Sequence, residues 1–565
     1  MRFYFLAGWL LTLWGAAAQS HHSVFITELM PDPSPSIGLP GYEWIEIRNG
    51  SGQSLQLQQW RVGTSTSLSG PLPSYSLAPD SMLILCSATA LPFLALHGKA
   101  LAVSSFPALD NEGTTVWLRH PTGRVIHAVA YEKSWYKNQW KAEGGWSIEM
   151  IDWRWPCAGK NNWKASVQDK GGTPGEINSV QDLRTTLMIP TALYSYASAA
   201  NKICIQFSGS IDSGWSVQTD SYQLSRGAKI VSAKTIDLSH SLLELSVDQP
   251  LQIDSVYRLS WTGIKTCYSD SRGSAGQLKT GRASPGKSMD VIINELLFNP
   301  RSGGSDFIEC FNNSDHILDL SNLYLTNRQP GGGLGTFIRL SQTTRLLFPG
   351  EYYSFSSDPA LIMQQYLVSS PTHLLQTNGF PSLPDESGHV VLLNHQGEIL
   401  DELQYSEDWH FPLLQNKEGI SLERINPKER TQWANNWHSA AKTEGFATPT
   451  RKNSQQRSNE VADLSFRVDP PLFTPNLDGL NDICTIFYQT AQPGTLASVQ
   501  ILDPAGRLLR VLAARSLLGT QGYWYWDGRD ELGNLLTAGN YLLVLTTYTL
   551  QGVIRHYRQG ISLWR

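Results

Sequence analysis

The sequence contains few charged residues for its length. Asp, Glu, Lys and Arg make up 16% of its 565 residues, whereas ordinary soluble proteins contain about 25%. The formal net charge is −5, and the Lys and Arg residues are scattered along the chain. A protein that binds nucleic acid needs a concentrated basic surface to neutralise phosphates. We therefore expect no nucleic-acid partner.

Long apolar runs are also scarce. The most apolar stretch lies at the N-terminus, where Arg2 supplies a positive charge, residues 4–14 are mostly apolar, and Ala16 to Ala18 are small. This order is typical of a secretory signal, so residues 1–20 are predicted to be a signal peptide. The run is shorter than the roughly 20 residues that cross a bilayer. We expect no membrane span and a soluble, exported mature protein.

Catalytic signatures are missing as well. The sequence contains no G-x-S-x-G, H-E-x-x-H, C-x-x-C or Walker motif, and these motifs carry the nucleophiles, metal ligands and phosphate loops of large enzyme classes. We therefore assign no catalytic residue and predict that the protein is not an enzyme.

One long segment is present twice. Residues 24–29 recur as 291–296, and residues 44–49 recur as 307–312. Further landmarks lie 274 positions apart (397 − 123), namely Gly123 and Gly397, Ser147 and Ser421, Glu149 and Glu423, and Trp163 and Trp437. This constant spacing predicts a duplicated folding unit of about 160 residues. Surface modules are repeated in one chain more often than enzymes are.

The duplication divides the chain into modules. Within each module, short alternating apolar runs end at Gly, Pro, Asn or Asp, which is typical of β-hairpins, and no long helical periodicity is visible. The predicted fold is all-β, with several immunoglobulin-like β-sandwich domains in series. The predicted parts are a first copy (23–180), an intermediate segment (183–273), a second copy (290–456) and a C-terminal segment (463–565), with polar linkers at 274–289 and 452–460.

The duplication also suggests how two of the six cysteines pair. Cys86 and Cys157 lie in the first copy, and the aligned positions of the second copy hold Ser356 and Thr431. Both cysteines are absent together, as expected for bridge partners in an oxidising compartment. We therefore predict a Cys86–Cys157 disulfide.

The remaining cysteines have no such comparison. Cys204 and Cys267 bracket the intermediate segment and are predicted to form a second disulfide. Cys310 aligns with the core-facing Ile47, and Cys484 stands alone, so both are expected to be buried free thiols. A bridge between Cys310 and Cys484 is the alternative.

The duplicated residues carry a family resemblance. Ile26 to Leu29, Glu43 to Asn49 and the end Gly171 to Ser179 resemble the lamin tail domain found in secreted bacterial proteins. The second copy keeps most of this pattern but ends in residues 446–450 without the glycines. The resemblance covers somewhat more than half of the chain. It implies an immunoglobulin-like β-sandwich that binds a partner rather than catalysing a reaction.

The other two segments carry resemblances of their own. Residues 203–273 are similar to bacterial immunoglobulin-like domains. Phe473 to Asp482, Trp526 to Gly528 and the terminal residues 560–565 resemble the gliding-motility-associated C-terminal domain, although Leu477 replaces the usual glycine. This resemblance implies export across an outer membrane by a type IX-like route, with the secretion machinery as the partner of residues 463–565.

Paired carboxylates are the most suggestive candidates for chemistry. Glu28 with Glu46, and Glu295 with Glu309, recur in both copies, and two acids in a cleft can perform acid–base catalysis. No matched His, Cys or Lys accompanies them in the motif. A structural role, in which the carboxylates accept hydrogen bonds, is the favoured interpretation.

A second candidate site is a short acidic and amide-rich loop. Asn476, Asp478, Asn481 and Asp482 offer oxygen ligands at a spacing that suits Ca²⁺. The pattern lacks the terminal Glu of an EF-hand, and Asx side chains also form tight turns without a metal. These four residues are weak calcium candidates, and no other cofactor is expected.

Nineteen tryptophans raise the possibility of sugar binding, because exposed aromatic rings stack on sugar rings. Trp163 and Trp437 recur at one position of the duplication, which favours core packing for both. The same argument applies to Trp135 and Trp409, which are also 274 positions apart (409 − 135). Exposed aromatic rings are expected instead at Tyr136 and Trp140.

Together these patterns predict a non-enzymatic adhesion or scaffolding protein that is secreted or held on the outer cell surface. One alternative is a calcium-dependent extracellular hydrolase that uses the repeated glutamate pair. Another is an array of carbohydrate-binding modules. The expected partner is a surface protein or a glycan.

Overall fold

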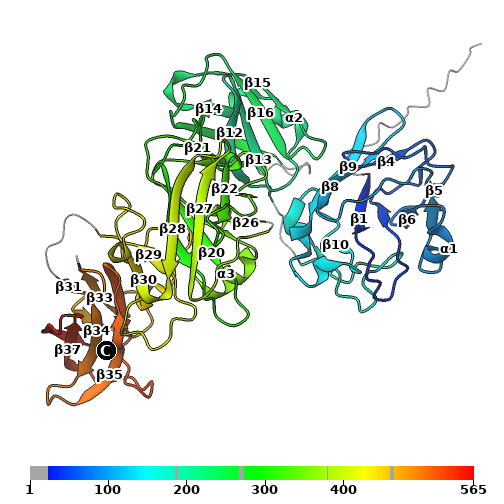
Figure 1. Ribbon diagram of the computed structural model, residues 1–565. Coiled ribbons are helices and arrows are strands. Elements are labelled where there is room, and N and C mark those ends of the chain that lie inside the picture. Colours follow the sequence, from blue (N-terminus) through cyan, green and yellow to red (C-terminus); the bar gives the residue numbers. More distant parts are fainter. Residues whose placement is uncertain are drawn as a thin grey trace, which may run out of the picture. The chain divides into compact units, whose positions relative to one another are not determined.

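The computed structural model describes residues 23–564, except 185–188, 266–272, 378, 458–463 and 491. Figure 1 shows a chain built mainly of strands. Its α-helices are short: α1 (Leu91–Leu94), α2 (Ser213–Ser216) and α3 (Pro359–Gln365). The prediction of an all-β protein with immunoglobulin-like sandwiches in series is confirmed. The predicted signal peptide lies outside the described residues.

The first copy contains a sheet of six strands in the order β11-β10-β1-β2-β6-β7. The central strand β1 is buried at every position, since both faces of this sheet are covered, and Thr27 and Glu28 are its only polar residues. The strands are β1 (Val24–Met30), β2 (Trp44–Asn49), β6 (Met82–Cys86), β7 (Ala100–Ala102), β10 (Ile148–Met150) and β11 (Trp163–Ala165).

A second layer covers one face of this sheet. Apolar side chains of the two layers, among them Ile26, Val116 and Trp163, pack into one core. The second layer consists of the three-stranded sheet β4 (Arg61–Gly63), β8 (Gly113–Arg119) and β9 (Val125–Glu132), and of the pair β3 (Leu55–Gln56) and β5 (Ser76–Leu77).

The second copy repeats the six-stranded sheet strand for strand, in the order β30-β29-β19-β20-β25-β26. Even the irregularity of the first strand recurs, because the register shifts between Ile26 and Glu28 in β1 and between Ile293 and Glu295 in β19. The strands are β19 (Val291–Leu297), β20 (Phe307–Asn312), β25 (Tyr352–Ser356), β26 (Leu374–Gln376), β29 (Leu422–Arg424) and β30 (Trp437–Ser439).

The second layer of this copy is larger than that of the first copy. Its four-stranded sheet has the order β23-β22-β27-β28, and a separate pair is formed by β21 and β24. Their bounds are β21 (Leu318–Asp319), β22 (Leu323–Asn327), β23 (Ile338–Arg339), β24 (Leu346–Leu347), β27 (Ser387–Asn394) and β28 (Ile399–Ser406).

The intermediate segment forms two sheets, in the orders β12-β13-β16-β15 and β14-β17-β18. Residues 274–280, predicted to be part of a linker, are instead strand β18. Its side chains alternate between half-buried and exposed, and an edge strand of this kind needs few apolar residues. The bounds are β12 (Ala192–Ala199), β13 (Lys202–Phe207), β14 (Tyr222–Leu224), β15 (Ile230–Thr235), β16 (Leu242–Val247), β17 (Tyr257–Ile264) and β18 (Ser274–Thr280).

The C-terminal segment has a three-stranded sheet, β31-β33-β36, and a five-stranded sheet, β32-β38-β37-β34-β35. Phe473, Ile486 and Trp526 belong to the core between them. The bounds are β31 (Ser465–Asp469), β32 (Leu472–Phe473), β33 (Cys484–Gln489), β34 (Leu496–Leu502), β35 (Leu508–Leu517), β36 (Gln521–Trp526), β37 (Gly539–Tyr548) and β38 (Ile554–Leu563).

The described residues divide into two compact units, one with residues 23–195, 201–250 and 258–279 and one with residues 196–200, 251–257 and 280–564. In the second unit, the predicted linker after the second copy is partly buried. Gln455 Nε2 donates to the Leu518 carbonyl at 3.0 Å, and Thr520 N donates to the Ser454 carbonyl at 2.7 Å. These polar residues therefore join the second copy to the C-terminal segment.

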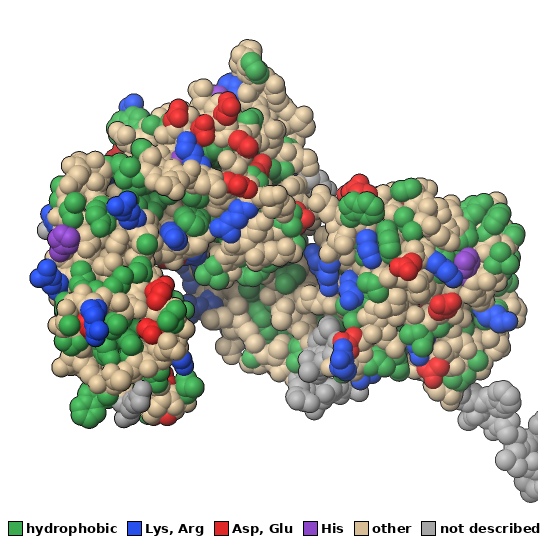
Figure 2. Space-filling model, turned by 90° about the horizontal axis from the view of Figure 1, so that it is seen from below, with side chains coloured by type: hydrophobic (Ala, Val, Ile, Leu, Met, Phe, Trp, Pro, Cys, Tyr) green, Lys and Arg blue, Asp and Glu red, His purple; other side chains and the backbone are tan. Residues whose placement is uncertain are grey.

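Surface charge is sparse, as the composition indicates. Figure 2 shows Lys, Arg, Asp and Glu side chains standing mostly apart from one another on the face in view. No helix within the described ranges is long and apolar enough to cross a membrane.

Candidate functional site

Three glutamates meet on the six-stranded sheet of the first copy. Glu28 of β1 lies opposite Glu46 of β2 on one side and Glu149 of β10 on the other. Directly opposed residues on neighbouring antiparallel strands place their side chains on the same face of the sheet. All three side chains are fully buried. We call Glu28, Glu46 and Glu149 the first glutamate cluster.

The segment after β11 covers this cluster and donates hydrogen bonds to it. Glu28 accepts from Ser147 Oγ at 2.6 Å, from Thr173 N at 2.8 Å and from Thr173 Oγ1 at 3.1 Å. Glu46 accepts from Thr27 Oγ1 at 2.9 Å and from Gly175 N at 2.6 Å. The cluster thus fastens residues 173–180, which we call the first strap, to the sheet.

Glu149 completes the attachment of the first strap. Its carboxylate accepts from Ser179 Oγ at 2.9 Å, from Val180 N at 3.1 Å and from Thr173 Oγ1 at 3.0 Å. Asn178 adds two bonds to the sheet, since its Nδ2 donates to the carbonyls of Thr27 and Met150. Every donor to the cluster comes from the chain itself.

The second copy contains the same arrangement. Glu295 of β19 lies opposite Glu309 of β20 and Glu423 of β29. These three, the second glutamate cluster, are fully buried. The second strap comprises residues 448–455. Its bonds run from Thr448 N to Glu295 at 2.8 Å, from Thr450 N to Glu309 at 2.6 Å, and from Ser454 Oγ and Gln455 N to Glu423 at 2.7 and 2.9 Å.

Burial makes these carboxyl groups hard to ionise. It raises the pKa of Glu46 to about 7 and, together with repulsion from Glu46 and Glu149, raises the pKa of Glu28 well above its usual range. In the second copy, burial raises the pKa of Glu295 to about 8, with Glu423 adding to the effect. Burial, together with repulsion from Glu295, also raises the pKa of Glu309 well above its ordinary value. Several of these groups are therefore protonated at neutral pH.

The geometry of the clusters opposes catalysis. A glycosidase needs two carboxyl groups that face a cleft with room for the substrate and a water molecule. Here the straps fill that space, and the side chains of Glu28 and Glu295 have no solvent exposure. The structure thus brings each repeated glutamate pair together and adds a third glutamate to it, Glu149 in the first copy and Glu423 in the second.

His127 in the first copy and Asp401 in the second occupy equivalent positions and accept the same backbone hydrogen bond, although their side chains differ. His127 Nδ1 accepts a hydrogen bond from Ile26 N at 3.1 Å, and Asp401 Oδ2 accepts from Ile293 N at 2.8 Å. Both donors belong to the irregular part of the first strand. Burial lowers the pKa of His127 to about 4. Its ring is therefore neutral, with Nδ1 unprotonated and Nε2 donating to the Pro156 carbonyl.

The acidic member of this pair is accompanied by further polar residues. Thr431 Oγ1 donates to Asp401, Arg424 Nη2 donates to Thr431, and Arg424 Nη1 lies 3.5 Å from Asp401. Position 424 corresponds to Met150 and position 431 to Cys157 in the first copy. A buried charge needs a partner, so the change from His127 to Asp401 is accompanied by an arginine and a threonine.

The calcium candidates lie in an exposed loop that its own backbone closes. Asp482 accepts from Leu477 N at 2.5 Å and from Gly479 N at 2.8 Å, and Asp478 accepts from Leu480 N at 2.8 Å. Asn476 Nδ2 donates to Asp478 at 2.9 Å. These are Asx turns, and within the described ranges no group of three or more His, Cys, Asp or Glu residues is arranged to hold a metal. Asn481 has a positive φ of 55°.

Both predicted disulfides are wrong. Cys86 and Cys204 are buried free thiols, whereas Cys157 is disulfide-bonded. Cys86 lies on β6 and Cys157 follows β10, and β1 and β2 lie between those strands. Cys157 lies instead against the intermediate segment, because its carbonyl accepts a hydrogen bond from Ser210 N at 2.9 Å. Cys267 lies outside the described residues.

The other cysteines are as expected. Cys310 and Cys484 are buried free thiols. Burial raises the pKa of Cys484 to about 12 and holds that of Cys310 well above its ordinary value. Both thiols are therefore protonated and unreactive at neutral pH.

Three of the four tryptophans that are predicted to pack in the cores are buried, whereas Trp409 is half-buried against the core of the second copy. Trp163 and Trp437 are core residues, and Trp135 packs against Trp163 with ring centroids 6.1 Å apart. Trp140 is 82% exposed, as predicted. Tyr136, however, is buried, because its ring packs in the core of the first copy, where its hydroxyl donates to the Trp146 carbonyl at 3.1 Å.

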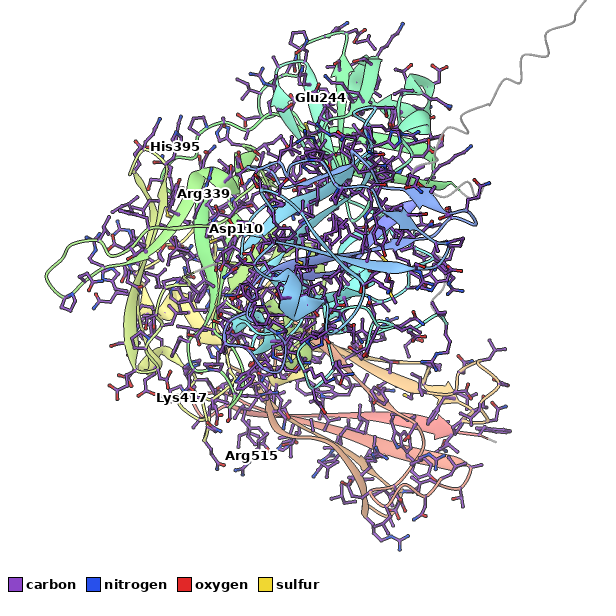
Figure 3. All side chains as sticks on the ribbon, turned by 90° about the vertical axis from the view of Figure 1, so that its right-hand side faces the viewer. Asp110, Glu244, Arg339, His395, Lys417 and Arg515 are labelled. Carbon is purple, nitrogen blue, oxygen red and sulfur yellow. The ribbon has the colours of Figure 1, made fainter. Side chains whose placement is uncertain are left out.

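Polar groups elsewhere in the structure mainly stabilise the fold. Glu244 of β16, labelled in Figure 3, lies 3.0 Å from Lys202 Nζ and 3.4 Å from Lys234 Nζ. A cleft of about 340 Å³ in the second unit includes Arg282, Asn394 and the labelled His395 in its lining. Arg282 Nη1 donates to the Leu251 carbonyl and Asn394 Nδ2 to the Gly286 carbonyl. These two bonds hold Arg282 and Asn394 in the cleft wall.

Comparison with known proteins supports part of this description. Residues 17–133 match the family model of the Lamin Tail Domain. The match includes Glu28 and Glu46 but ends before Glu149. No curated protein matches the chain.

Several solved structures share limited similarity with the chain. A DUF4876 family protein from Bacteroides thetaiotaomicron is 14% identical over 32% of this chain and 77% of its own, with a TM-score of 0.18. The N-terminal part of the bacterial S-layer protein SbsC is 12% identical over 38% of this chain and 43% of its own, with a TM-score of 0.16. A Ca²⁺-stabilized adhesin of an Antarctic bacterium is 9% identical over 96% of this chain and 100% of its own, with a TM-score of 0.12.

This chain thus spans less than half the length of the matched S-layer structure. At these TM-scores the similarities carry no argument about function. The features that bear on function are the geometry shared by the two copies and the Lamin Tail Domain match.

Proposed function

We propose that this chain is an exported, non-enzymatic adhesion or scaffolding protein that acts outside the cell or on its surface. The observation that carries this proposal is the closure of both glutamate clusters. The groups best suited to acid–base chemistry are buried, and their hydrogen-bonding capacity is used by residues of the straps. Rigid modules with closed interiors offer their surfaces, rather than an internal site, for function.

We also propose that the second copy is a further lamin tail domain. It shares the strand order, the strand irregularity and the glutamate cluster of the first copy. Two such modules in one chain allow two simultaneous contacts with a surface, which strengthens attachment without any new kind of interaction.

The C-terminal segment is proposed to direct export by a type IX-like route. Its resemblance to the gliding-motility-associated domain motivates this proposal, and its separate hydrophobic core is compatible with a sorting module. The secretion machinery would then be its partner.

Surface labelling of intact native cells tests this export route. The full chain is expected on the surface or in the medium, and a chain without residues 463–565 is expected in the periplasm. Leu517→Ala is the matched control, because Leu517 packs where this segment contacts the second copy. This variant loosens the contact but retains the segment, so it should still be exported. Surface exposure of the truncated chain would refute the type IX-like assignment.

The rival hydrolase is tested by assaying turnover. The purified chain and a Glu28→Gln/Glu295→Gln variant are incubated with glycans, esters and peptides, with and without Ca²⁺. We expect no turnover by either protein. An activity that the folded variant lacks would establish the glutamate clusters as catalytic and refute the non-enzymatic function.

A further inference from the structure

One face of the C-terminal segment carries exposed aromatic rings. Side chains alternate along a strand, so in β36 Trp524 and Trp526 point into the core, whereas Tyr523 and Tyr525 are each 62% exposed. Phe487 of the neighbouring strand β33 is exposed on the same side. Cross-strand pairing of such rings stabilises a sheet by less than about 1 kcal/mol, whereas a contiguous group of exposed apolar side chains is typical of a binding surface.

The strand register gathers these rings into one patch. Arg467 of β31 lies opposite Phe487, which in turn lies opposite Tyr523. The Phe487 and Tyr523 rings are 6.2 Å apart between centroids, and the Arg467 guanidinium lies 5.0 Å from the Phe487 ring centroid. Tyr525 follows two residues after Tyr523, about 7 Å further along the strand. The rings therefore form a short row on the sheet surface.

The rest of this face is polar and carries balanced charge. Arg467 Nη1 lies 3.1 Å from Asp469 Oδ2, so the two charges on the face offset each other. No Leu, Ile, Val or Met occurs among the outward positions of the sheet. We call this set the aromatic face: Ser465, Arg467, Asp469, Thr485, Phe487, Gln489, Gln521, Tyr523 and Tyr525.

We propose that the aromatic face binds an uncharged polysaccharide. A sugar ring offers an apolar C–H face that can lie on a tyrosine ring, and a rim of hydroxyl groups that can bond amides and phenols. Within the described residues, the side chains of Gln489, Gln521, Tyr523 and Tyr525 form no hydrogen bond with one another or with another side chain or carbonyl. These groups are therefore available to a ligand.

The composition of the aromatic face favours a neutral glycan over a protein partner or an acidic polymer. A protein partner usually docks on aliphatic as well as aromatic anchors, and aliphatic side chains longer than Thr are absent from these outward positions. An acidic polymer would need unpaired cations, but Arg467 is paired with Asp469. A glycan partner presupposes that the chain acts outside the cell, so this inference rests on the proposed function.

Co-sedimentation of the full chain with cellulose, chitin and starch, together with titration of soluble β-glucan and mannan, tests the proposal. We expect the chain to bind at least one of these polymers. Tyr523→Ala/Tyr525→Ala should weaken that binding roughly tenfold or more, because about 1.4 kcal/mol corresponds to a factor of ten. Tyr523→Phe/Tyr525→Phe retains the rings and should bind more tightly than the alanine variant. Trp140→Ala, which removes an exposed aromatic ring from the first copy, should bind as the wild type does.

An unchanged melting temperature would establish that each variant is folded. Absence of binding to every polymer, equal binding by the alanine variant, or capture of a protein at this face without any glycan would overturn the proposal. Surface labelling and a cell-adhesion assay separate this result from the proposed function. A surface-exposed, adhesive chain that binds none of the polymers leaves the proposed function intact and removes only the glycan partner.

Discussion

At the residue scale, the duplication identifies two of the clustered glutamates in each copy but not the residues that they contact. Glu28 and Glu46 recur with a constant spacing, so the sequence identified them as a matched pair. Their contact with Glu149 depends on the pairing of β1 with β10, and these two strands lie more than a hundred positions apart in the sequence. Sequence spacing alone cannot supply such a register.

Equivalent contacts are harder to predict at positions where the two copies carry different residues. His127 and Asp401 accept the same backbone hydrogen bond, but their difference in side chain conceals the equivalence. The joint absence of Cys86 and Cys157 from the second copy suggested a bridge, yet each replacement has its own reason. Thr431 bonds Asp401, while Ser356 Oγ donates to the Asp306 carbonyl.

The glutamate clusters predict how stability depends on pH. A carboxyl group whose folded pKa lies above its unfolded value of 4.5 contributes stability that is present below pH 4.5 and lost as the pH rises through the folded pKa. The folded values are about 7 for Glu46 and about 8 for Glu295. We therefore expect these clusters to make both copies less stable at pH 9 than at pH 5.

Two substitutions of Glu28 separate the carboxyl charge from its shape. Glu28→Gln retains an oxygen that accepts from Ser147 and Thr173 and gains an NH₂ that can donate to Thr173 Oγ1. It should fold well and reduce the loss of stability between pH 5 and pH 9. Glu28→Ala should destabilise the first copy by about 3 kcal/mol at pH 5, because it leaves a cavity and unpaired donors. Denaturant unfolding at both pH values measures this, and a Gln variant with an undiminished pH slope would contradict it.

At the element scale, each strap covers the outer face of its six-stranded sheet and donates hydrogen bonds to the glutamates buried there. The sheets themselves could be predicted from the alternating apolar runs, and so could the placement of Trp163 and Trp437 in the cores. The straps could not, because residues 173–180 and 448–455 lack a strand pattern and are held by polar contacts. For a similar reason, the polar strand β18 resembled a linker.

Thr173 is the main fastening of the first strap, and its replacement should loosen that element. Thr173→Val retains the size of the side chain but removes the hydroxyl that donates to Glu28 and Glu149. We expect a loss of about 1–3 kcal/mol from the first copy, the cost of unpaired buried groups, and faster amide exchange at Gly175 and Val180. The exposed Thr122→Val is the control, and exchange at Gly175 that equals the wild-type rate would contradict the prediction.

At the scale of the whole molecule, the modules are easier to predict from the sequence than the contacts between them. The sequence predicts a polar linker over residues 452–460, but Asn453, Ser454 and Gln455 are buried. Ser454 and Gln455 serve two contacts at once, since they bond Glu423 on one side and Thr520 or Leu518 on the other. Polar composition predicts exposure only where no polar partner is available, and here the neighbouring modules provide one.

This connection predicts that the second copy and the C-terminal segment stabilise each other. Phe411 of the second copy packs with Leu496 and Leu517 of the C-terminal segment, and all three are buried. Phe411→Ala and Leu517→Ala should each destabilise the chain, by roughly 2–4 kcal/mol for buried groups of this size. Because the two side chains share one contact, their effects should not add, and the coupling should be about 0.5–3 kcal/mol.

A double-mutant cycle measured by denaturant unfolding tests this coupling. Phe411→Ala combined with Ile561→Ala is the matched control, since Ile561 lies in the core of the C-terminal segment and outside the shared cluster. The control pair should be additive within about 0.5 kcal/mol. Additivity of Phe411→Ala with Leu517→Ala would mean that the two modules unfold independently. In that case, the bonds of Ser454 and Gln455 would position the C-terminal segment without stabilising the second copy.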